Sequence, residues 1–135
     1  MDKTVIATPD APAAIGPYSQ GIAGNGLVFV SGQLPVDPKT GAMPETIEAQ
    51  ARQSLTNLKA IIEASGSSLD KVVKTTCFLA DIADFAAFNA VYAEFFPKDA
   101  PARSCFQVAA IPKNAKLEVE ALSLIHISEP TRLDV

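Results

Sequence analysis

Two short segments of the sequence carry the side chains best suited to acid, base and carboxylate-binding chemistry. In the first, Arg103 stands where a loop enters an expected strand, and Cys105 follows two residues later, on the same face. A guanidinium can hold a carboxylate through two parallel hydrogen bonds, which lysine cannot reproduce. By itself, an arginine at a strand start is more often solvated, and a cysteine such as Cys105 is as often a small buried hydrophobe as a reactive thiol.

The second segment is a strand pattern near the end of the chain, in which two glutamates alternate with apolar residues. Glu118 and Glu120 therefore share one face, and the other face carries Leu117, Val119 and Ala121. On a free surface both acids are simply solvated, and spacing alone favours that interpretation. If the sheet packs against a partner subunit, at least one acid is desolvated and becomes suited to proton transfer.

Four further residues are candidates for a pocket. Tyr18 is either an interface aromatic or a hydroxyl donor into a pocket. Ser31 and Gly32 end an expected buried strand, where a missing Cβ lets a ligand approach the backbone. Asn89 is the polar exception in a largely apolar helix, and a helix-surface amide is slightly favoured over a site role.

Several common kinds of site are excluded or disfavoured. His126 is the only histidine in the sequence, which excludes a multi-histidine metal site. The sequence lacks a phosphate-binding Gly-Lys loop, and Gly24-Asn25-Gly26 is better explained as a hairpin turn than as a dinucleotide site. We therefore expect an activity with no metal and no cofactor.

Composition indicates one soluble domain. The 135 residues are 48% hydrophobic and 19% charged, with a net charge of -4 and a pI near 4.9, which disfavours a nucleic-acid module. Two cysteines cannot form a dense disulfide framework and suit a reducing interior. We find neither a signal-peptide pattern nor an apolar run near the roughly 20 residues that span a bilayer, so we expect a cytoplasmic protein.

The elements that must position these side chains begin with strands. Residues 4–7 form a short expected strand, and residues 19–24 and 27–31 flank Asn25-Gly26, which favours a hairpin with a type I′ turn. Residues 27–30 are continuously apolar and should be buried on both sides, by a helix layer or by a partner subunit.

Two amphipathic helices follow. Apolar residues at intervals of three and four predict a helix over 47–62, with Pro44 near its first turn and Gly66 as its C-terminal cap. A strand is expected over 72–79, and then a second helix capped by Asp81 or Asp84. The inner face of that helix is expected to carry Phe85, Phe88, Val91, Tyr92 and Phe95. Strands over 103–109 and 116–122 are expected to form a closing hairpin, giving an α+β sandwich with both helices on one sheet face.

Taken together, these segments resemble the RidA (YjgF) family of reactive intermediate imine deaminases. The resemblance runs from about residue 3 to residue 122, and its ordered combination is highly specific. The matching segments are Ala14-Ile15-Gly16-Pro17-Tyr18-Ser19-Gln20, Val30-Ser31-Gly32-Gln33-Leu34-Pro35, Gln50-Ala51-Arg52-Gln53-Ser54-Leu55-Thr56-Asn57-Leu58, Pro101-Ala102-Arg103-Ser104 and Leu117-Glu118-Val119-Glu120-Ala121.

The resemblance implies a chorismate-mutase-like α+β fold and a homotrimer with three sites in clefts between subunits. It implies hydrolysis of 2-imino acids and their enamines, such as 2-iminobutanoate and 2-iminopropanoate, to 2-oxo acids and ammonia. It also implies roles for individual residues: Arg103 clamps the substrate carboxylate, Glu120 manages the water and its protons, and Tyr18 completes the catalytic set. The implied pocket-lining residues are Ser31, Gly32, Asn89 and Cys105.

The chain departs from the family pattern at its end. We therefore expect one domain over residues 1–122, and a tail over 123–135 that lies outside the pattern and could still extend the last strand. Two other functions stay open, namely an endoribonuclease or translation inhibitor, and a noncatalytic module that binds small carboxylates. The acidic composition and the lone tail histidine argue against the first.

Overall fold

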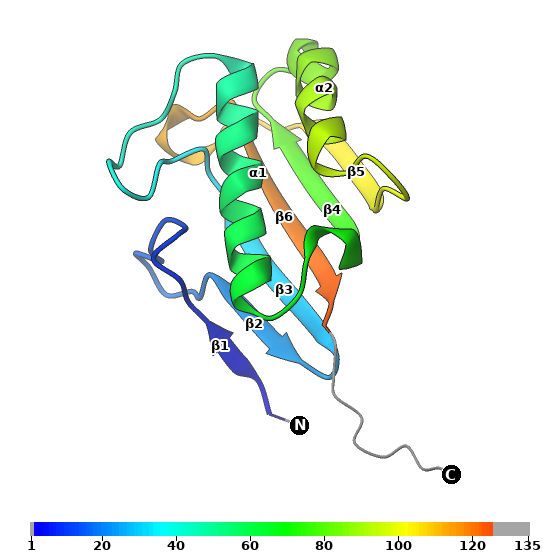
Figure 1. Cartoon of the computed structure of the whole chain (residues 1–135). Coiled ribbons are helices and arrows are strands. Elements are labelled where there is room, and N and C mark those ends of the chain that lie inside the picture. The colour runs from blue at the N-terminus through cyan, green and yellow to red at the C-terminus, as the bar shows by residue number, and fades with distance from the viewer. Residues whose placement is uncertain (1, 126–135) are drawn as a thin grey trace.

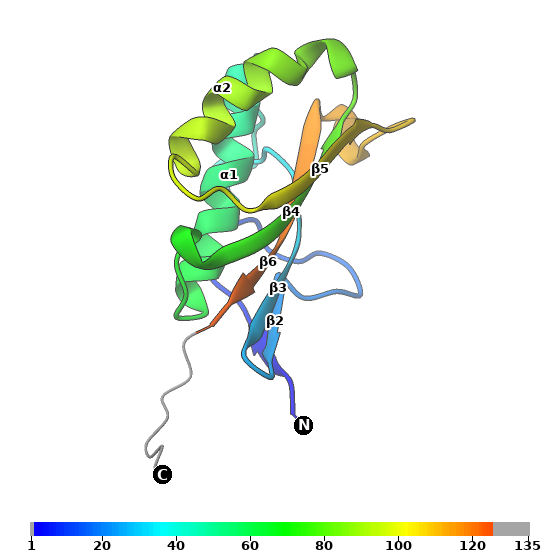
Figure 2. The same cartoon turned by 90° about the vertical axis from the view of Figure 1, so that its right-hand side faces the viewer.

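A computed structural model describes residues 2–125 as a six-stranded mixed sheet with two α-helices on one face (Figures 1 and 2). The order of the strands in the sheet is β1-β2-β3-β6-β4-β5. The strands are β1 Thr4–Ile6, β2 Gly21–Gly24, β3 Leu27–Gln33, β4 Val72–Leu79, β5 Ala102–Gln107 and β6 Leu117–Leu124, and the helices are α1 Ile47–Ala64 and α2 Phe85–Phe95. The expected α+β class, with both helices on one face, is confirmed.

The turn between β2 and β3 has the backbone conformation that its sequence predicts. Asn25 has φ 54° and Gly26 has φ 80°, the two positive angles of a type I′ turn. The antiparallel register pairs Gly24 with Leu27, so the hairpin is confirmed.

Helix α1 begins and ends at local sequence signals. Thr46 is the N-cap, and its hydroxyl accepts a hydrogen bond from the backbone N–H of Ala49 at 3.1 Å, so Pro44 lies outside the first turn. At the other end Gly66 has φ 91°, and the N–H groups of Gly66 and Ser67 donate to the carbonyls of Glu63 and Ile62. This is the Schellman arrangement, and it confirms the expected glycine cap.

Helix α2 follows a short 3₁₀ turn, Ile82–Asp84. Asp81 caps that turn through a bond from the N–H of Ala83, whereas Asp84 precedes α2 without a side-chain capping bond. Phe88, Val91 and Tyr92 are buried as expected. Phe85, by contrast, keeps 37% of its surface exposed at the start of the helix.

The expected closing hairpin is wrong. Strand β5 pairs with β4 in parallel, and β6 lies between β3 and β4, antiparallel to both. A parallel pair needs a crossover connection, and α2 supplies it between β4 and β5. The last strand thereby becomes a central strand of the sheet, with the glutamate pair in the middle of the molecule.

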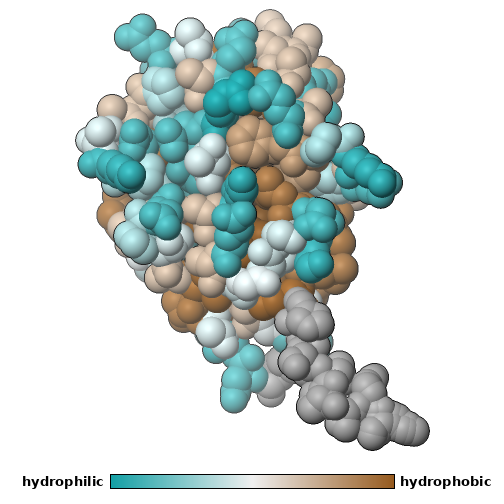
Figure 3. All heavy atoms as spheres, viewed as in Figure 1, coloured by the Kyte–Doolittle hydropathy of each residue, from teal (hydrophilic) through white to brown (hydrophobic). Residues whose placement is uncertain are grey.

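The helices cover only one of the two faces of the sheet. Helices α1 and α2 cover what we call the helix face, where Val28 and Val30 of β3 are almost fully buried. Hydrophilic side chains are spread over the outer surface on that side (Figure 3). On the other, open face, Phe29 is 52% exposed. The burial expected for residues 27–30 is therefore confirmed on the helix face only, within this single chain.

The last strand continues past the expected domain end at residue 122. Ser123 is fully buried, and its hydroxyl lies 3.1 Å from that of Ser67. Residues 126–135 of the expected tail, including His126, lie outside the described residues. Within residues 2–125, neither helix has the length and apolar character needed to cross a membrane.

Candidate active site

Five polar or catalytically suited positions meet in a hollow beside the sheet, which we call the acidic hollow. Its volume is about 720 Å³, and its wall includes Tyr18, Ser31, Gly32, Glu118 and Glu120. Irregular segments around residues 12–20, 33–41 and 112–113 complete the wall. Four of the seven residues predicted for the site therefore lie together here.

A β-bulge shapes the hollow at its centre. Val30 pairs with Ala121 and Gln33 pairs with Val119, so β3 uses one more residue than β6 between these pairs. Ser31 and Gly32 occupy the bulge opposite Glu120. The carboxyl group of Glu118 packs so closely over Gly32 that a Cβ there would collide with it. The missing side chain of Gly32 thus makes room for an acid of the chain itself.

Glu118 has the environment of an acid or base, although the sequence prediction selected Glu120. Burial raises the pKa of the Glu118 carboxyl above its ordinary value, and the nearby charge of Glu120 raises it further. Glu118 is half-buried, whereas Glu120 is exposed. The alternating pattern placed both acids on one face, but only the bulge distinguishes them, and Gly32 inside the strand pattern was the one sequence signal that could have indicated it.

Ser31 holds the loop that carries Tyr18. Its hydroxyl donates to the carbonyl of Ser19 at 2.6 Å, and its backbone N–H donates to the carbonyl of Gln20 at 2.9 Å. The Tyr18 side chain is 53% exposed and lies against Gly16. Because the Ser31 hydroxyl already donates its proton to the carbonyl of Ser19, it could only accept a hydrogen bond from a ligand.

Buried amide side chains satisfy the backbone of the irregular wall. Gln20 accepts from the N–H of Thr8 and donates to the carbonyls of Thr8, Ala11 and Pro12. Asn57 donates to the carbonyls of Leu34 and Val36 at 3.1 and 2.9 Å. Gln50 joins the carbonyl of Pro44 to the N–H of Lys116. Loop backbone needs such partners when it is buried, and these residues supply them.

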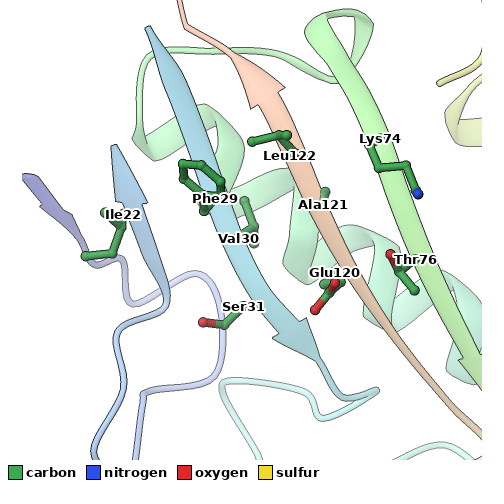
Figure 4. Close-up of a pocket in the computed structure, with 9 residues that line it drawn as sticks. All are labelled: Ile22, Phe29, Val30, Ser31, Lys74, Thr76, Glu120, Ala121 and Leu122. Atoms are coloured by element: carbon green, nitrogen blue, oxygen red, sulfur yellow. The ribbon is translucent and has the colours of Figure 1, made fainter. Parts of the chain in front are cut away.

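A second hollow of about 430 Å³ lies on the open face (Figure 4). Its polar wall comes from Ser31, Glu120, Thr76 and Lys74, and its apolar wall includes Ile22, Phe29 and Leu122. Ser31 and Glu120 line both hollows, so the open face and the acidic hollow meet at these two residues.

The remaining predicted residues lie on the helix face, around Arg103. The Arg103 guanidinium donates to the side-chain oxygen of Asn89 at 2.7 Å. Its Cζ lies 4.8, 5.5 and 5.9 Å from the ring centroids of Tyr92, Phe85 and Phe88. We call these five residues the arginine cluster. Among residues 2–125 the half-buried Arg103 has no carboxylate within ion-pair distance.

Cys105 lies beside the cluster and pairs with Cys77 in the parallel register. Burial raises the pKa of Cys77 to about 12. Burial also raises the pKa of Cys105, and the positive charge of Arg103 offsets part of that increase. Both thiols are therefore poor nucleophiles at neutral pH. This environment favours the interpretation of Cys105 as a pocket wall.

Arg103 and Glu120 do not meet within one chain. Arg103 pairs with Thr75, which is fully buried under the helices, whereas Glu120 pairs with Thr76 on the open face. Successive residues of a strand point to opposite faces, so the arginine cluster and the acidic hollow lie on opposite sides of the sheet. Within residues 2–125, no group of three His, Cys, Asp or Glu side chains is arranged to hold a metal ion.

Comparison with known proteins matches residues 8–125 to the model of the Endoribonuclease L-PSP family, the same family as RidA and YjgF. The match covers nearly all of the described chain, including both glutamates and the arginine. The chain belongs to the L-PSP/RidA family.

Relatives within the L-PSP/RidA family are similar to this chain over more than nine tenths of its length. The 2-iminobutanoate/2-iminopropanoate deaminase of Salmonella typhimurium is 55% identical over 127 residues, covering 92% of this chain and 98% of the relative. Reactive Intermediate Deaminase A of Arabidopsis thaliana is 51% identical over 126 residues, covering 93% of this chain and 67% of the relative.

Solved structures of the family share the fold. Escherichia coli TdcF with bound serine has a TM-score of 0.89 and 48% identity, covering 91% of this chain and 99% of that one. The Escherichia coli YjgF structure has a TM-score of 0.86 and 52% identity, covering 90% of this chain and 98% of that one. The names of the curated relatives favour an imine deaminase over the other two functions that the sequence leaves open.

Proposed function

We propose that this chain hydrolyses 2-imino acids, such as 2-iminobutanoate and 2-iminopropanoate, to 2-oxo acids and ammonia. The observation that carries the proposal is the arginine cluster. One of the five N–H donors of Arg103 is used by Asn89, and the half-buried guanidinium has no carboxylate partner among residues 2–125. A small carboxylate fits that need, and two closely similar relatives bear the name of this deaminase.

We further propose that the site combines two subunits of a homotrimer. The arginine cluster and the acidic hollow lie on opposite faces of one sheet, so one chain cannot offer both to one small substrate. The exposed Phe29, with Ile22 and Leu122 beside it, gives the open face an apolar surface that a second copy would cover. Covering this face would also desolvate Glu118 further and place it near the arginine of a neighbour.

The chemistry then needs only the residues of the chain and one water. Arg103 fixes the substrate carboxylate by charge-assisted pairing. Glu118 accepts a proton from the water molecule while the water oxygen forms a bond to the imine carbon. Glu118 passes that proton to the imine nitrogen. When the carbon–nitrogen bond breaks, the proton of the new hydroxyl moves through Glu118 to the nitrogen, which leaves as ammonia. Glu120, predicted for this role, sustains the raised pKa of Glu118, and Tyr18 closes the pocket.

Arg103→Ala tests the proposal. Purified protein should accelerate release of 2-oxo acid and ammonia from imine generated in the assay by an amino acid oxidase. We expect Arg103→Ala to reduce kcat/KM by about a hundredfold or more, because a charge-assisted clamp is lost. The measurement is coupled detection of the 2-oxo acid.

Arg52→Ala is the matched control for the loss of an arginine. Arg52 is exposed on α1 and pairs with Glu94 of α2 at 2.5 Å, away from both halves of the site. The Arg52→Ala variant should keep the activity of the unmodified protein. Failure of the unmodified protein to accelerate the reaction, or equal activity of Arg103→Ala, contradicts the proposal.

The description of the family model favours one second candidate, an endoribonuclease. The acidic hollow and the net charge of -4 oppose the binding of a phosphate backbone. Cleavage of a defined RNA that persists through purification and disappears in Glu118→Gln and Glu120→Gln would support it. Saturable binding of a 2-oxo acid without any turnover would instead select the noncatalytic module.

A further inference from the structure

Tyr92 has no assigned role so far, although it makes two contacts in the arginine cluster. Its ring lies against the guanidinium of Arg103, and its hydroxyl is hydrogen-bonded to the strand beneath the helix. Its ring centroid lies 4.8 Å from the Cζ of Arg103, nearer than those of the two phenylalanines of the cluster. Its hydroxyl lies 2.7 Å from that of Thr75, which is fully buried. The Tyr92 ring is thus fixed at one end to the strand next to Arg103.

The strand register explains why this contact is specific. Thr75 of β4 is the direct partner of Arg103 of β5, so both side chains point to the helix face side by side. Tyr92 projects from α2 toward the sheet. Its hydroxyl is hydrogen-bonded to that of Thr75, and its ring lies against the guanidinium of Arg103. The Thr75 hydroxyl therefore sets where the ring lies, and the ring sets where the guanidinium can lie.

We propose that Tyr92 is a positioning residue that orients Arg103 for the carboxylate of the ligand. An arginine side chain has many rotamers, and ordering it on binding costs affinity. A cation over an aromatic face is attracted to it, and a ring anchored by its own hydroxyl limits the rotamers before the ligand arrives. Asn89 holds one edge of the guanidinium at 2.7 Å, and Tyr92 holds its face. This inference rests on the proposed function, since the ligand is the same carboxylate.

The test compares three variants for binding of 2-oxobutanoate, measured by calorimetric titration. Tyr92→Leu removes the ring and should weaken binding by about tenfold, the size of a partly desolvated cation–π contact. Tyr92→Phe keeps the ring but removes its anchor on Thr75, so it should weaken binding less than Tyr92→Leu does, by about threefold. Phe96→Leu removes a neighbouring ring that lies 4.7 Å from Tyr92, outside the arginine cluster. It should lower Tm without changing the binding of 2-oxobutanoate.

A double-mutant comparison separates positioning from damage to the fold. In the Arg103→Ala background, Tyr92→Leu should weaken binding no further, because the group it positions is gone. Equal weakening in both backgrounds, an unchanged Kd in Tyr92→Leu alone, or a loss in Phe96→Leu as large as in Tyr92→Leu would each overturn the inference.

A second readout does not depend on the ligand. The side-chain Nε–H resonance of Arg103, assigned by its loss in Arg103→Lys, should be shifted by ring currents in the unmodified protein. The shift should persist in Tyr92→Phe and largely disappear in Tyr92→Leu. If the unmodified protein fails to bind 2-oxobutanoate, the carboxylate site and the proposed function are wrong. If it binds while the resonance is the same in all variants, only the role of Tyr92 is wrong.

Discussion

At the scale of single residues, two glutamates two positions apart have unlike surroundings. Glu118 packs over the bare backbone of Gly32 and is half-buried, whereas Glu120 is exposed at the edge shared by both hollows. Pairs of acids whose environments differ in this way commonly divide the roles of base and electrostatic partner. Here the difference comes from a single extra residue in β3.

This difference predicts a pH effect. Because the charge of Glu120 helps to raise the pKa of Glu118, Glu120→Gln should bring the pKa of Glu118 down toward its ordinary value. Glu118 acts in its ionised form, so activity falls as the pH drops through this pKa. The acid limb of a kcat/KM profile should therefore move to lower pH in Glu120→Gln. An acid limb that stays in place would show that Glu118 is not the base.

At the scale of elements, α1 supports the site through its buried polar residues rather than through catalytic ones. Ser54 and Asn57 are both fully buried on this helix, three residues apart. Asn57 satisfies two loop carbonyls that shape the acidic hollow. The Ser54 hydroxyl, by contrast, is buried with no hydrogen-bond partner in the described structure.

Alanine should have unlike effects on stability at the two positions. Asn57→Ala leaves the Leu34 and Val36 carbonyls unpaired and should lower the free energy of unfolding by about 2 kcal/mol or more. Ser54→Ala removes an unpaired hydroxyl from a helix and should be neutral or stabilising by up to about 1 kcal/mol. Urea denaturation measures both. Equal destabilisation by the two substitutions would contradict this account of α1.

At the scale of the whole molecule, the sheet separates the two halves of the proposed site. The helix face presents Arg103 at one edge strand, and the open face presents an apolar surface beside the acidic hollow. The proposed homotrimer would account for both the bare face of the sheet and the separation of the two halves of the site.

Assembly predicts complementation between two inactive variants. Arg103→Ala and Glu118→Gln each destroy one half of every site in a homotrimer. When the two proteins are unfolded together and refolded in equal amounts, about one quarter of the sites regain an arginine from one chain and a glutamate from the other. Activity of the mixture should rise to about that fraction, and sedimentation should give a trimer. A mixture as inactive as its components would place both residues in one chain's site.

Local patterns in the sequence determined most of the helices and strands and the glycine cap of α1. The Asn25-Gly26 turn, the Gly66 cap and the buried face of α2 depend on neighbours within a few residues, so the sequence alone predicts them. The alternation in β6 likewise determined which residues share a face. The family resemblance, carried by five ordered segments, is confirmed by the match over residues 8–125.

Only the tertiary structure decided the pairing of β5 and the difference in burial between the two glutamates. Strand pairing depends on contacts between segments far apart in the chain, which alternation does not encode, and β6 therefore appeared as the partner of β5 rather than of β3 and β4. The bulge at Ser31 and Gly32 arises from the same long-range pairing. It brings Glu118 against the backbone, and burial rather than residue type then raises the pKa of one of two chemically identical acids, the difference on which the proposed role of Glu118 rests.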